Sequence, residues 1–196
     1  CSNDNETINA PFHQGKIYIN EVFQTMKKNQ IFIAGRMSNK IQHLAQLYNV
    51  NTVDILERED MAVLNAIPTA EGAIQIAMEE MAITLHDSVC LILGFGRIGK
   101  ILAKMLSALG ADVYVEARKF SDIAWIKSYG YKPVLLDNID NIIPKADAIF
   151  NTIPSIILDE NKLKLLNKDC LIIDLASKPG GVDFDKAKEL GVKAIW

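Results

Sequence analysis

Residues 89–120 have the sequence VCLILGFGRIGKILAKMLSALGADVYVEARKF, and this stretch decides the fold. An apolar run is followed at once by the glycine pattern GFGRIG, and an amphipathic segment then leads to a second apolar run that starts at Asp112. This succession predicts a strand over 89–93, a helix over 97–109 and a strand over 112–116. Strand, glycine turn, helix and strand together indicate the first half of an α/β sheet.

Strands and helices continue to alternate after residue 120. We expect helices over 121–129, 138–143, 160–166 and 183–190, and strands over 133–135, 146–150, 170–174 and 192–196. Strands such as VCLIL, DAIF and CLIID are apolar without interruption, which is typical of strands buried on both faces. Six such strands alternating with helices predict an α/β fold with a doubly wound parallel sheet, Rossmann-like, in the order 3-2-1-4-5-6.

The composition is that of a folded protein. Of the 196 residues, 49% are hydrophobic and 23% are charged, close to the averages for globular domains of about 45–50% and about 25%. The formal net charge of −3 disfavours a broad basic face for nucleic acid or anionic lipid. No apolar run approaches the ~18 residues of a membrane span and no signal peptide opens the chain, so we expect a cytoplasmic location.

The three cysteines indicate neither a disulfide framework nor a metal site. Cys1, Cys90 and Cys170 are odd in number and lack a CxxC spacing. Because Cys90 and Cys170 lie inside apolar runs, we expect them to be buried, inert thiols. The chain begins with Cys1 and stops at Trp196 directly after an apolar run, so we expect a fragment that lacks both ends.

The character of the chain changes near Pro68. Before it, a strand over 31–34, a helix capped by Ser38 and a strand over 53–56 predict part of a smaller N-terminal α/β lobe. Pro68 itself is expected at the start of a long helix that joins this lobe to the sheet. The expected parts are therefore a partial lobe (1–67), a connecting helix (68–87) and a nucleotide-binding domain (88–196).

The glycine pattern at 94–99 predicts a dinucleotide-binding site. Gly94 permits a tight turn, Gly96 lets the backbone approach a pyrophosphate, and Gly99 lets the helix pack closely on the sheet. The helix N-terminus adds free N–H groups and a partial positive charge. The candidate cofactor contacts here are Gly94, Phe95, Gly96, Arg97, Ile98 and Gly99. A strand-to-helix turn in a fold that has lost its ligand is the alternative.

The end of the second strand favours NADP over NAD. In an NAD-binding domain, a carboxylate about 20 residues beyond the glycines accepts hydrogen bonds from the ribose. That position is expected at Ala117, followed by Arg118 and Lys119, whose charges suit the 2′-phosphate of NADP. Side-chain alternation predicts that Glu116 points away from the ribose. If the strand ends one residue earlier, Glu116 reads the ribose of NAD instead, and Arg118 and Lys119 are an exposed surface pair.

Two further strand ends are expected to face the cofactor or the substrate, because ligands of open parallel sheets bind outside the carboxyl ends of the strands. The candidate cofactor contacts there are Asn151, Thr152, Ile153, Pro154, Asp174 and Ala176. For Asn151 and Asp174 the alternative is capping of their own loops.

Four stretches resemble the A subunits of dipicolinate synthase from endospore-forming bacteria. They are NAIPTAEGAIQIAM, LILGFGRIGKILAKMLSALGADVYVEARKF, NTIPSIIL and LIIDLASKPGGVDF, within residues 57–196. The combination of NTIPS with DLASKPGG carries the resemblance, since the glycine pattern alone fits many dehydrogenases. In the preceding part, AGRMSNK also resembles the strand-to-helix turn of that family.

The resemblance implies NADP-dependent oxidation and dehydration of hydroxy-tetrahydrodipicolinate to pyridine-2,6-dicarboxylate, in the mother cell of a sporulating bacterium. The implied partner is the family's flavoprotein-like B subunit, and a homo-oligomer stays open. A dianionic substrate needs cations or N–H groups, and the candidates by position are Ser38, Asn39, Thr69, Glu71, Ser177 and Lys178. The catalytic acid or base stays open among Ser177, Lys178, Glu71, Asp174 and water.

Two other functions fit the same sequence pattern. One is an NAD(P)-dependent dehydrogenase of another small 2-hydroxy acid, for which we expect a catalytic histidine late in the chain; His13, His43 and His86 do not fit that place. The other is a non-catalytic protein that binds NADP within a larger assembly. Coenzyme binding without turnover would favour this last interpretation.

Overall fold

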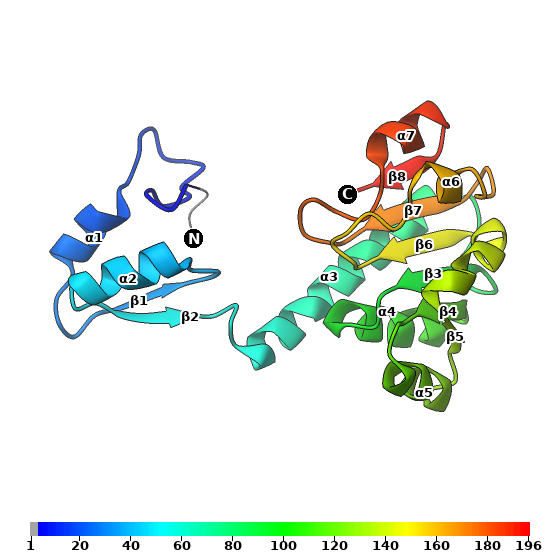
Figure 1. Cartoon of the computed structure of the whole chain (residues 1–196), viewed down its shortest axis with the longest axis horizontal. Coiled ribbons are helices and arrows are strands. Elements are labelled where there is room, and N and C mark those ends of the chain that lie inside the picture. Colours follow the sequence, from blue (N-terminus) through cyan, green and yellow to red (C-terminus); the bar gives the residue numbers. More distant parts are fainter. Residues whose placement is uncertain (1–3) are drawn as a thin grey trace. The chain divides into compact units, whose positions relative to one another are not determined.

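The computed structural model describes residues 4–196, which form two compact units (Figure 1). One unit ends at Leu64 and the other runs from Asn65 to Trp196. Cys90 and Cys170 are buried free thiols, as expected, whereas Cys1 lies outside the described residues. Across residues 4–196, no helix is both long and apolar enough to cross a membrane.

The first unit is a small lobe around two parallel strands. Its elements are α1 (Ile19–Thr25), β1 (Ile31–Ala34), α2 (Asn39–Leu47) and β2 (Asn51–Asp54). The strands pair in parallel, with Ile31 opposite Asn51, and Ser38 caps α2 by accepting a hydrogen bond from the Ile41 N–H at 3.3 Å. The lobe and its cap are therefore confirmed. β2 begins and ends two residues before the expected range, because the Asp54 carboxylate turns back to accept backbone N–H groups.

The long helix α3 (Glu59–Glu80) begins nine residues earlier than expected, so the expectation that Pro68 opens it is wrong. Residues 59–67 are largely good helix formers, and Glu59 and Asp60 place negative charge in the first turn, where the helix dipole favours it. Pro68 removes one N–H donor from the interior of a 22-residue helix. The carbonyl left without this donor is that of Leu64, four residues earlier. The Thr69 Oγ1 donates instead to the next carbonyl, that of Asn65, at 2.9 Å.

The second unit contains the predicted six-stranded parallel sheet. Its strands are β3 (Val89–Leu93), β4 (Asp112–Glu116), β5 (Lys132–Val134), β6 (Ala148–Asn151), β7 (Leu171–Asp174) and β8 (Lys193–Ile195). Their order is β5-β4-β3-β6-β7-β8, which confirms the expected 3-2-1-4-5-6 arrangement. Every residue of β6 and β7 is buried, as their uninterrupted apolar character predicts.

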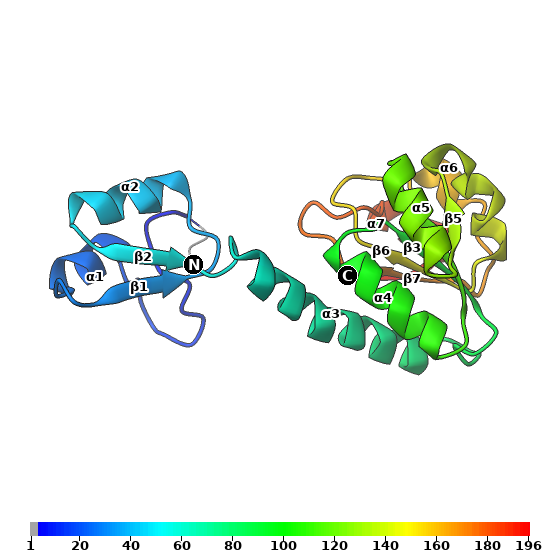
Figure 2. The same cartoon turned by 90° about the horizontal axis from the view of Figure 1, so that it is seen from below.

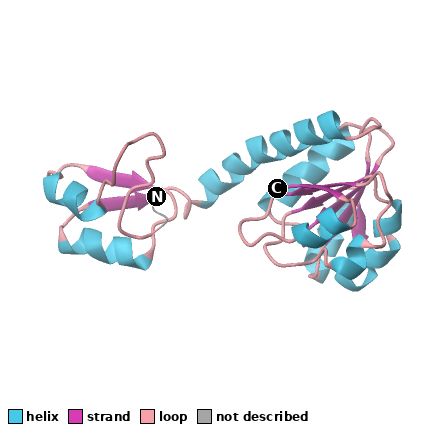
Figure 3. Ribbon diagram, turned by 90° about the horizontal axis from the view of Figure 1, so that it is seen from above, coloured by secondary structure: helices cyan, strands magenta, loops and turns pink. Residues whose placement is uncertain are grey.

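Helices cover both faces of this sheet (Figure 2, Figure 3). On one face, α3, α4 (Arg97–Ala108) and α5 (Phe120–Ser128) contribute Ala73, Leu102 and Ile126 to a buried core. On the other face lie two 3₁₀ helices, η1 (Leu136–Asn141) and η2 (Ile143–Lys145), followed by α6 (Glu160–Leu163) and α7 (Phe184–Glu189). The helix expected over 138–143 is split into η1 and η2, because Pro144 lies at the start of η2 and cannot donate to the preceding turn.

Candidate functional site

The glycine turn between β3 and α4 gives each glycine a different role. Gly94 has φ 96°, and a Cβ there would lie 2.6 Å from Thr152 Oγ1. A Cβ on Gly99 would overlap the carbonyl oxygen of Gly94, so α4 packs directly on the turn. Gly96 is the N-cap of α4, and a Cβ there would meet no atom within 4 Å. Of the three glycines, Gly96 is therefore the one that faces open space, where a ligand can approach the backbone.

A cleft of about 480 Å³ opens in front of this turn. Three segments line it: the glycine turn with the first turn of α4, the end of β4 with the start of α5, and the loop after β6. The lining residues are Gly94, Phe95, Gly96, Lys100, Glu116, Ala117, Arg118, Lys119, Asp122, Thr152, Ile153 and Pro154. Most of the predicted cofactor contacts are thus brought together.

Six predicted cofactor contacts do not line this cleft: Arg97, Ile98, Gly99, Asn151, Asp174 and Ala176. Conversely, the wall contains Lys100 and Asp122, which the sequence analysis missed. Both lie in the first turn of the helix that follows a cleft-lining segment, and that position is the signal by which they could have been found. The Lys100 ammonium lies over the Phe95 ring, 5.2 Å from its centroid.

Alternation predicts that Glu116 points away from the ribose, but the structure places Glu116 in the wall of the cleft that is the candidate coenzyme site. Its side chain is only 1% exposed, and its Oε2 accepts a hydrogen bond from the Gly94 N–H at 3.1 Å. Burial raises the pKa of this carboxyl, and the Gly94 N–H and the Arg118 charge oppose the rise. β4 ends at Glu116, although the Ala117 N–H still donates to the Val134 carbonyl at 3.1 Å. The Glu116 side chain extends beyond the end of β4 to a backbone N–H of the neighbouring turn. The alternation of side chains along a strand does not predict such a contact.

Asn151 and Asp174 join the ends of β6 and β7. The Asn151 Nδ2 donates to Asp174 Oδ1 at 2.8 Å and to the Ile153 carbonyl at 3.0 Å. Asp174 also accepts from the Ala176 N–H at 3.0 Å and from the Gly181 N–H at 2.7 Å. Both side chains are buried. These contacts are the loop-capping arrangement, and they leave the Asp174 carboxylate engaged by three N–H donors rather than free to move a proton.

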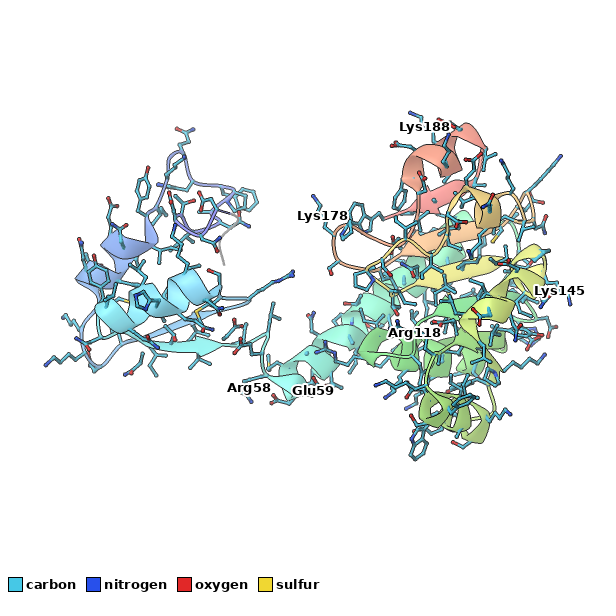
Figure 4. All side chains as sticks on the ribbon, viewed as in Figure 1. Arg58, Glu59, Arg118, Lys145, Lys178 and Lys188 are labelled. Atoms are coloured by element: carbon cyan, nitrogen blue, oxygen red, sulfur yellow. The ribbon has the colours of Figure 1, made fainter. Side chains whose placement is uncertain are left out.

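The loop after β7 presents Ser177 and Lys178 to solvent. The Lys178 ammonium lies 5.9 Å from the centroid of the Trp196 ring, and the Trp196 Nε1 donates to the Ala176 carbonyl at 3.0 Å. Phe184 stacks on Trp196, with 5.7 Å between the two ring centroids. Figure 4 shows Arg118 after β4 and Lys178 after β7, both beyond carboxyl ends of strands of one sheet.

Neither Thr69 nor Glu71 lines the glycine cleft. Thr69 uses its hydroxyl within α3, and Glu71 is exposed beside a separate apolar groove between α3 and α4. No cluster of three or more His, Cys, Asp or Glu side chains within the described chain is arranged to hold a metal ion.

In the first unit, Ser38 and Asn39 begin α2 directly after a turn that Asp54 stabilises. The Asp54 carboxylate accepts from the N–H groups of Arg36 and Met37, and Arg36 has φ 57°. Partial burial raises the pKa of Asp54, but the N–H groups of Met37, Arg36, Leu56 and Glu57 together lower it by more, so the net pKa is below its usual value. Asp54 could not be recognised from the sequence, because the turn that brings these N–H donors together has no signature in the hydrophobic pattern.

Comparison with known proteins links both units to known families. Residues 61–180 match the sequence model of the D-isomer specific 2-hydroxyacid dehydrogenase NAD binding domain. Residues 1–56 match that of the N-terminal domain of the dipicolinate synthase A subunit. The chain is 37% identical over 165 residues to the A subunit of dipicolinate synthase of Bacillus subtilis (strain 168), covering 84% of this chain and 56% of that protein.

Two crystal structures are similar over nearly the whole chain. The dipicolinate synthase A subunit from Bacillus halodurans has a TM-score of 0.88 at 31% identity, covering 100% of this chain and 67% of the other. The dipicolinate synthase A chain from Bacillus subtilis has a TM-score of 0.86 at 32% identity, covering 97% and 64%. The chain thus spans between 56% and 67% of the length of these relatives.

Proposed function

The chain belongs to the family of dipicolinate synthase A subunits, and on this premise we propose that it binds NADP and takes part in forming pyridine-2,6-dicarboxylate from hydroxy-tetrahydrodipicolinate. Its second unit carries the NAD(P)-binding dehydrogenase-like domain. The observation that carries the proposal is the cleft in which open backbone at Gly96 faces three cations, Lys100, Arg118 and Lys119.

The residues of the cleft fit a dinucleotide. A pyrophosphate is accommodated where Gly96 has no side chain and the N-terminus of α4 offers N–H groups. β4 ends at Glu116, a carboxylate of the kind that an NAD-binding domain carries at this strand end, and Ala117, Arg118 and Lys119 follow it. A 2′-phosphate carries about two negative charges near neutral pH, so it gains charge-assisted hydrogen bonds from such cations. The cations Arg118 and Lys119 support NADP as the coenzyme, whereas Glu116 is the residue of this wall that favours NAD.

The proposed reaction removes water and two hydrogens from the substrate, and aromatisation supplies the driving force. When bound, oxidised NADP accepts one of these hydrogens as hydride. The chain itself has mainly to bind and orient a small dianion. We assign Lys178 and Ser177 to a substrate carboxylate, because they follow β7 on a loop whose backbone Asp174 and Asn151 hold.

The remaining assignments rest on position alone. Ser38 and Asn39, at the N-terminus of α2, stay candidates for binding a carboxylate, and Thr69 and Glu71 stay candidates on α3. The proton carrier stays open among Ser177, Lys178, Glu71 and water, since Asp174 is engaged by three N–H donors. The proposed partner is the flavoprotein-like B subunit, and the proposed setting is the mother cell of a sporulating bacterium.

A fluorescence titration with NADPH and NADH tests the coenzyme assignment. We expect NADPH to bind more tightly, and Arg118→Ala to weaken NADPH binding by about tenfold or more, since a hydrogen bond to a charged group contributes about 1.5–3 kcal/mol. The matched control is Lys188→Ala, an exposed cation of α7 that does not line the cleft (Figure 4). Equal or tighter binding of NADH at every pH tested would refute the NADP assignment, and binding of neither coenzyme would refute the site.

Turnover is tested with the chain, the flavoprotein-like partner, NADP and the aldol product that precedes dipicolinate, by following the ultraviolet absorbance of dipicolinate. Formation that requires all components supports the proposal. Coenzyme binding without turnover favours the non-catalytic role. The match of residues 61–180 to 2-hydroxyacid dehydrogenases favours a second candidate, and oxidation of a small 2-hydroxy acid by the chain alone would replace the first.

A further inference from the structure

Glu116 is a buried carboxyl whose bonding is incomplete. Its Oε2 accepts from the Gly94 N–H, but its Oε1 is buried without a hydrogen-bond partner in the described part of the chain. A buried polar atom without a partner loses the hydrogen bonds it would make with water, so it needs either a proton or a donor from outside. Glu116 also lies in the wall of the glycine cleft. A hydroxyl of a ligand in this cleft is therefore a candidate donor for Oε1.

The charged neighbours of Glu116 come from three elements of the cleft. Arg118 and Lys119 follow it at the end of β4, Lys100 comes from α4 and Asp122 from α5. The turn after β3 and the loop after β6 contribute no charge to this wall; Thr152 there donates its hydroxyl to the Leu93 carbonyl at 2.8 Å. Glu116 is the acid that bonds directly to the glycine turn.

We propose that Glu116 selects the coenzyme through its proton: the carboxylate accepts a ribose hydroxyl of NAD and opposes the 2′-phosphate of NADP, whereas the neutral acid admits NADP. This rests on the proposed function of the same cleft. A carboxylate beside a dianionic phosphate is repelled, and an acceptor without a donor is satisfied by a hydroxyl. Glu116 lies directly before Ala117, and the cations Arg118 and Lys119 follow in the same cleft wall, where they attract the 2′-phosphate.

Glu116 releases its proton at a higher pH than an exposed glutamate does, because it is buried and its pKa is raised. Burial is the largest cause of its raised pKa, and the Gly94 N–H and Arg118 lower the pKa by less. Because the folded pKa lies above the unfolded value, Glu116 contributes less stability as pH rises from the unfolded pKa through the folded pKa. The contribution of Glu116 to NADPH affinity should likewise fall as pH rises, because the ionised carboxylate repels the 2′-phosphate. The 2′-phosphate itself protonates near pH ~6, which weakens binding to cations at low pH and so has the opposite sign.

The test compares the wild-type chain with Glu116→Gln, which keeps the shape and carries no charge at any pH. Dissociation constants for NADPH and NADH are measured by fluorescence between pH ~5.5 and ~8.5. At the highest pH, the variant should bind NADPH about tenfold more tightly and NADH several-fold less tightly than wild type, since one pKa unit of coupling is tenfold in affinity. The difference between the two proteins in NADPH affinity should shrink as pH falls. Asp169→Asn, an exposed acid outside the cleft, should match wild type throughout.

The outcomes separate this inference from the proposed function. If NADPH binds with the same pH profile in wild type and Glu116→Gln, the inference fails while the coenzyme site stands. If neither coenzyme binds, the proposed function fails, and thermal unfolding without ligand still tests the titration. There, the stability of wild type relative to Glu116→Gln should fall as pH rises. A constant difference across the pH range would overturn the proton-linked role of Glu116.

Discussion

Replacing Gly96 and Gly99 with alanine, one at a time, should separate ligand binding from packing within one turn. A methyl group on Gly99 overlaps the Gly94 carbonyl oxygen, a backbone atom that cannot rotate away. Overpacking of this kind costs about 1–3 kcal/mol or more, offset by about 1 kcal/mol because alanine is the better helix former. We expect Gly99→Ala to destabilise the protein by about 1–2 kcal/mol, which lowers Tm by about 2–8 °C in a chain of this size.

Gly96→Ala should weaken NADPH binding and leave the stability of the protein nearly unchanged. Its methyl group meets nothing within 4 Å, and its φ of −81° suits any residue. The weaker N-cap preference of alanine costs less than about 1 kcal/mol. The methyl group nevertheless occupies the space through which a pyrophosphate approaches the backbone. We therefore expect near-native stability with NADPH binding weakened about tenfold or more, the equivalent of about 1.4 kcal/mol.

Thermal unfolding by circular dichroism and fluorescence titration with NADPH, run on both variants, measure the two effects. The reasoning would be refuted by Gly96→Ala with unchanged NADPH affinity, because open space at that residue would then have no role in binding. It would equally be refuted by Gly99→Ala with unchanged Tm, because the close approach of α4 to the turn would then be absent in solution.

Three further predictions concern the second unit. Lys178→Ala should raise the KM for the substrate and leave the dissociation constant of NADPH unchanged; an unchanged KM in steady-state assays removes Lys178 from the substrate site. Asp174→Ala should cost about 3 kcal/mol or more in urea unfolding, because it leaves several buried N–H groups without an acceptor; a loss below about 1 kcal/mol would mean that water replaces the carboxylate. Burial raises the pKa of Cys90 to about 11 and that of Cys170 to about 12, so iodoacetamide at pH ~8 should leave both peptides unmodified in the folded protein and modify both in guanidinium, where the thiolate forms near pH ~8.5. Modification of either in the folded state, detected by mass spectrometry, would contradict its burial.

The sheet could be predicted because its determinants are local and repeated. The central strands β3, β6 and β7 are apolar runs that end at a glycine or a polar residue. The chain order of strands and helices then leaves few topologies. Pro68 misled because proline at a helix start and proline inside a helix have the same neighbours in sequence. Whether Pro68 starts the helix or lies inside it depends on whether residues 59–67 are helical. They are helical in α3, so Pro68 lies inside the helix.

The errors within the site have a different cause. Alternation assigns each side chain of a strand to one face of the sheet. Glu116 is the last residue of β4, and its long side chain instead extends beyond the strand end to accept a hydrogen bond from the Gly94 N–H. In the same way, Asp54 binds N–H groups of a turn whose left-handed Arg36 has no signature in the hydrophobic pattern. Side chains that pair with backbone donors across strand ends are thus the part that sequence periodicity cannot describe.

Thr152 connects the two halves of the strand-end region, the one proposed to bind the coenzyme and the one proposed to bind the substrate. Its hydroxyl donates to the Leu93 carbonyl at 2.8 Å, and it leaves no room for a side chain at Gly94. On the other side, Asn151 is bonded to Asp174, which holds the loop of Lys178. A chain of hydrogen bonds and one steric contact therefore runs from the glycine turn through the end of β6 to the end of β7. Because its members are mostly buried and bonded to backbone, the relative placement of the two halves is set before any ligand binds, which is the preorganisation that positioning a hydride donor against its acceptor requires.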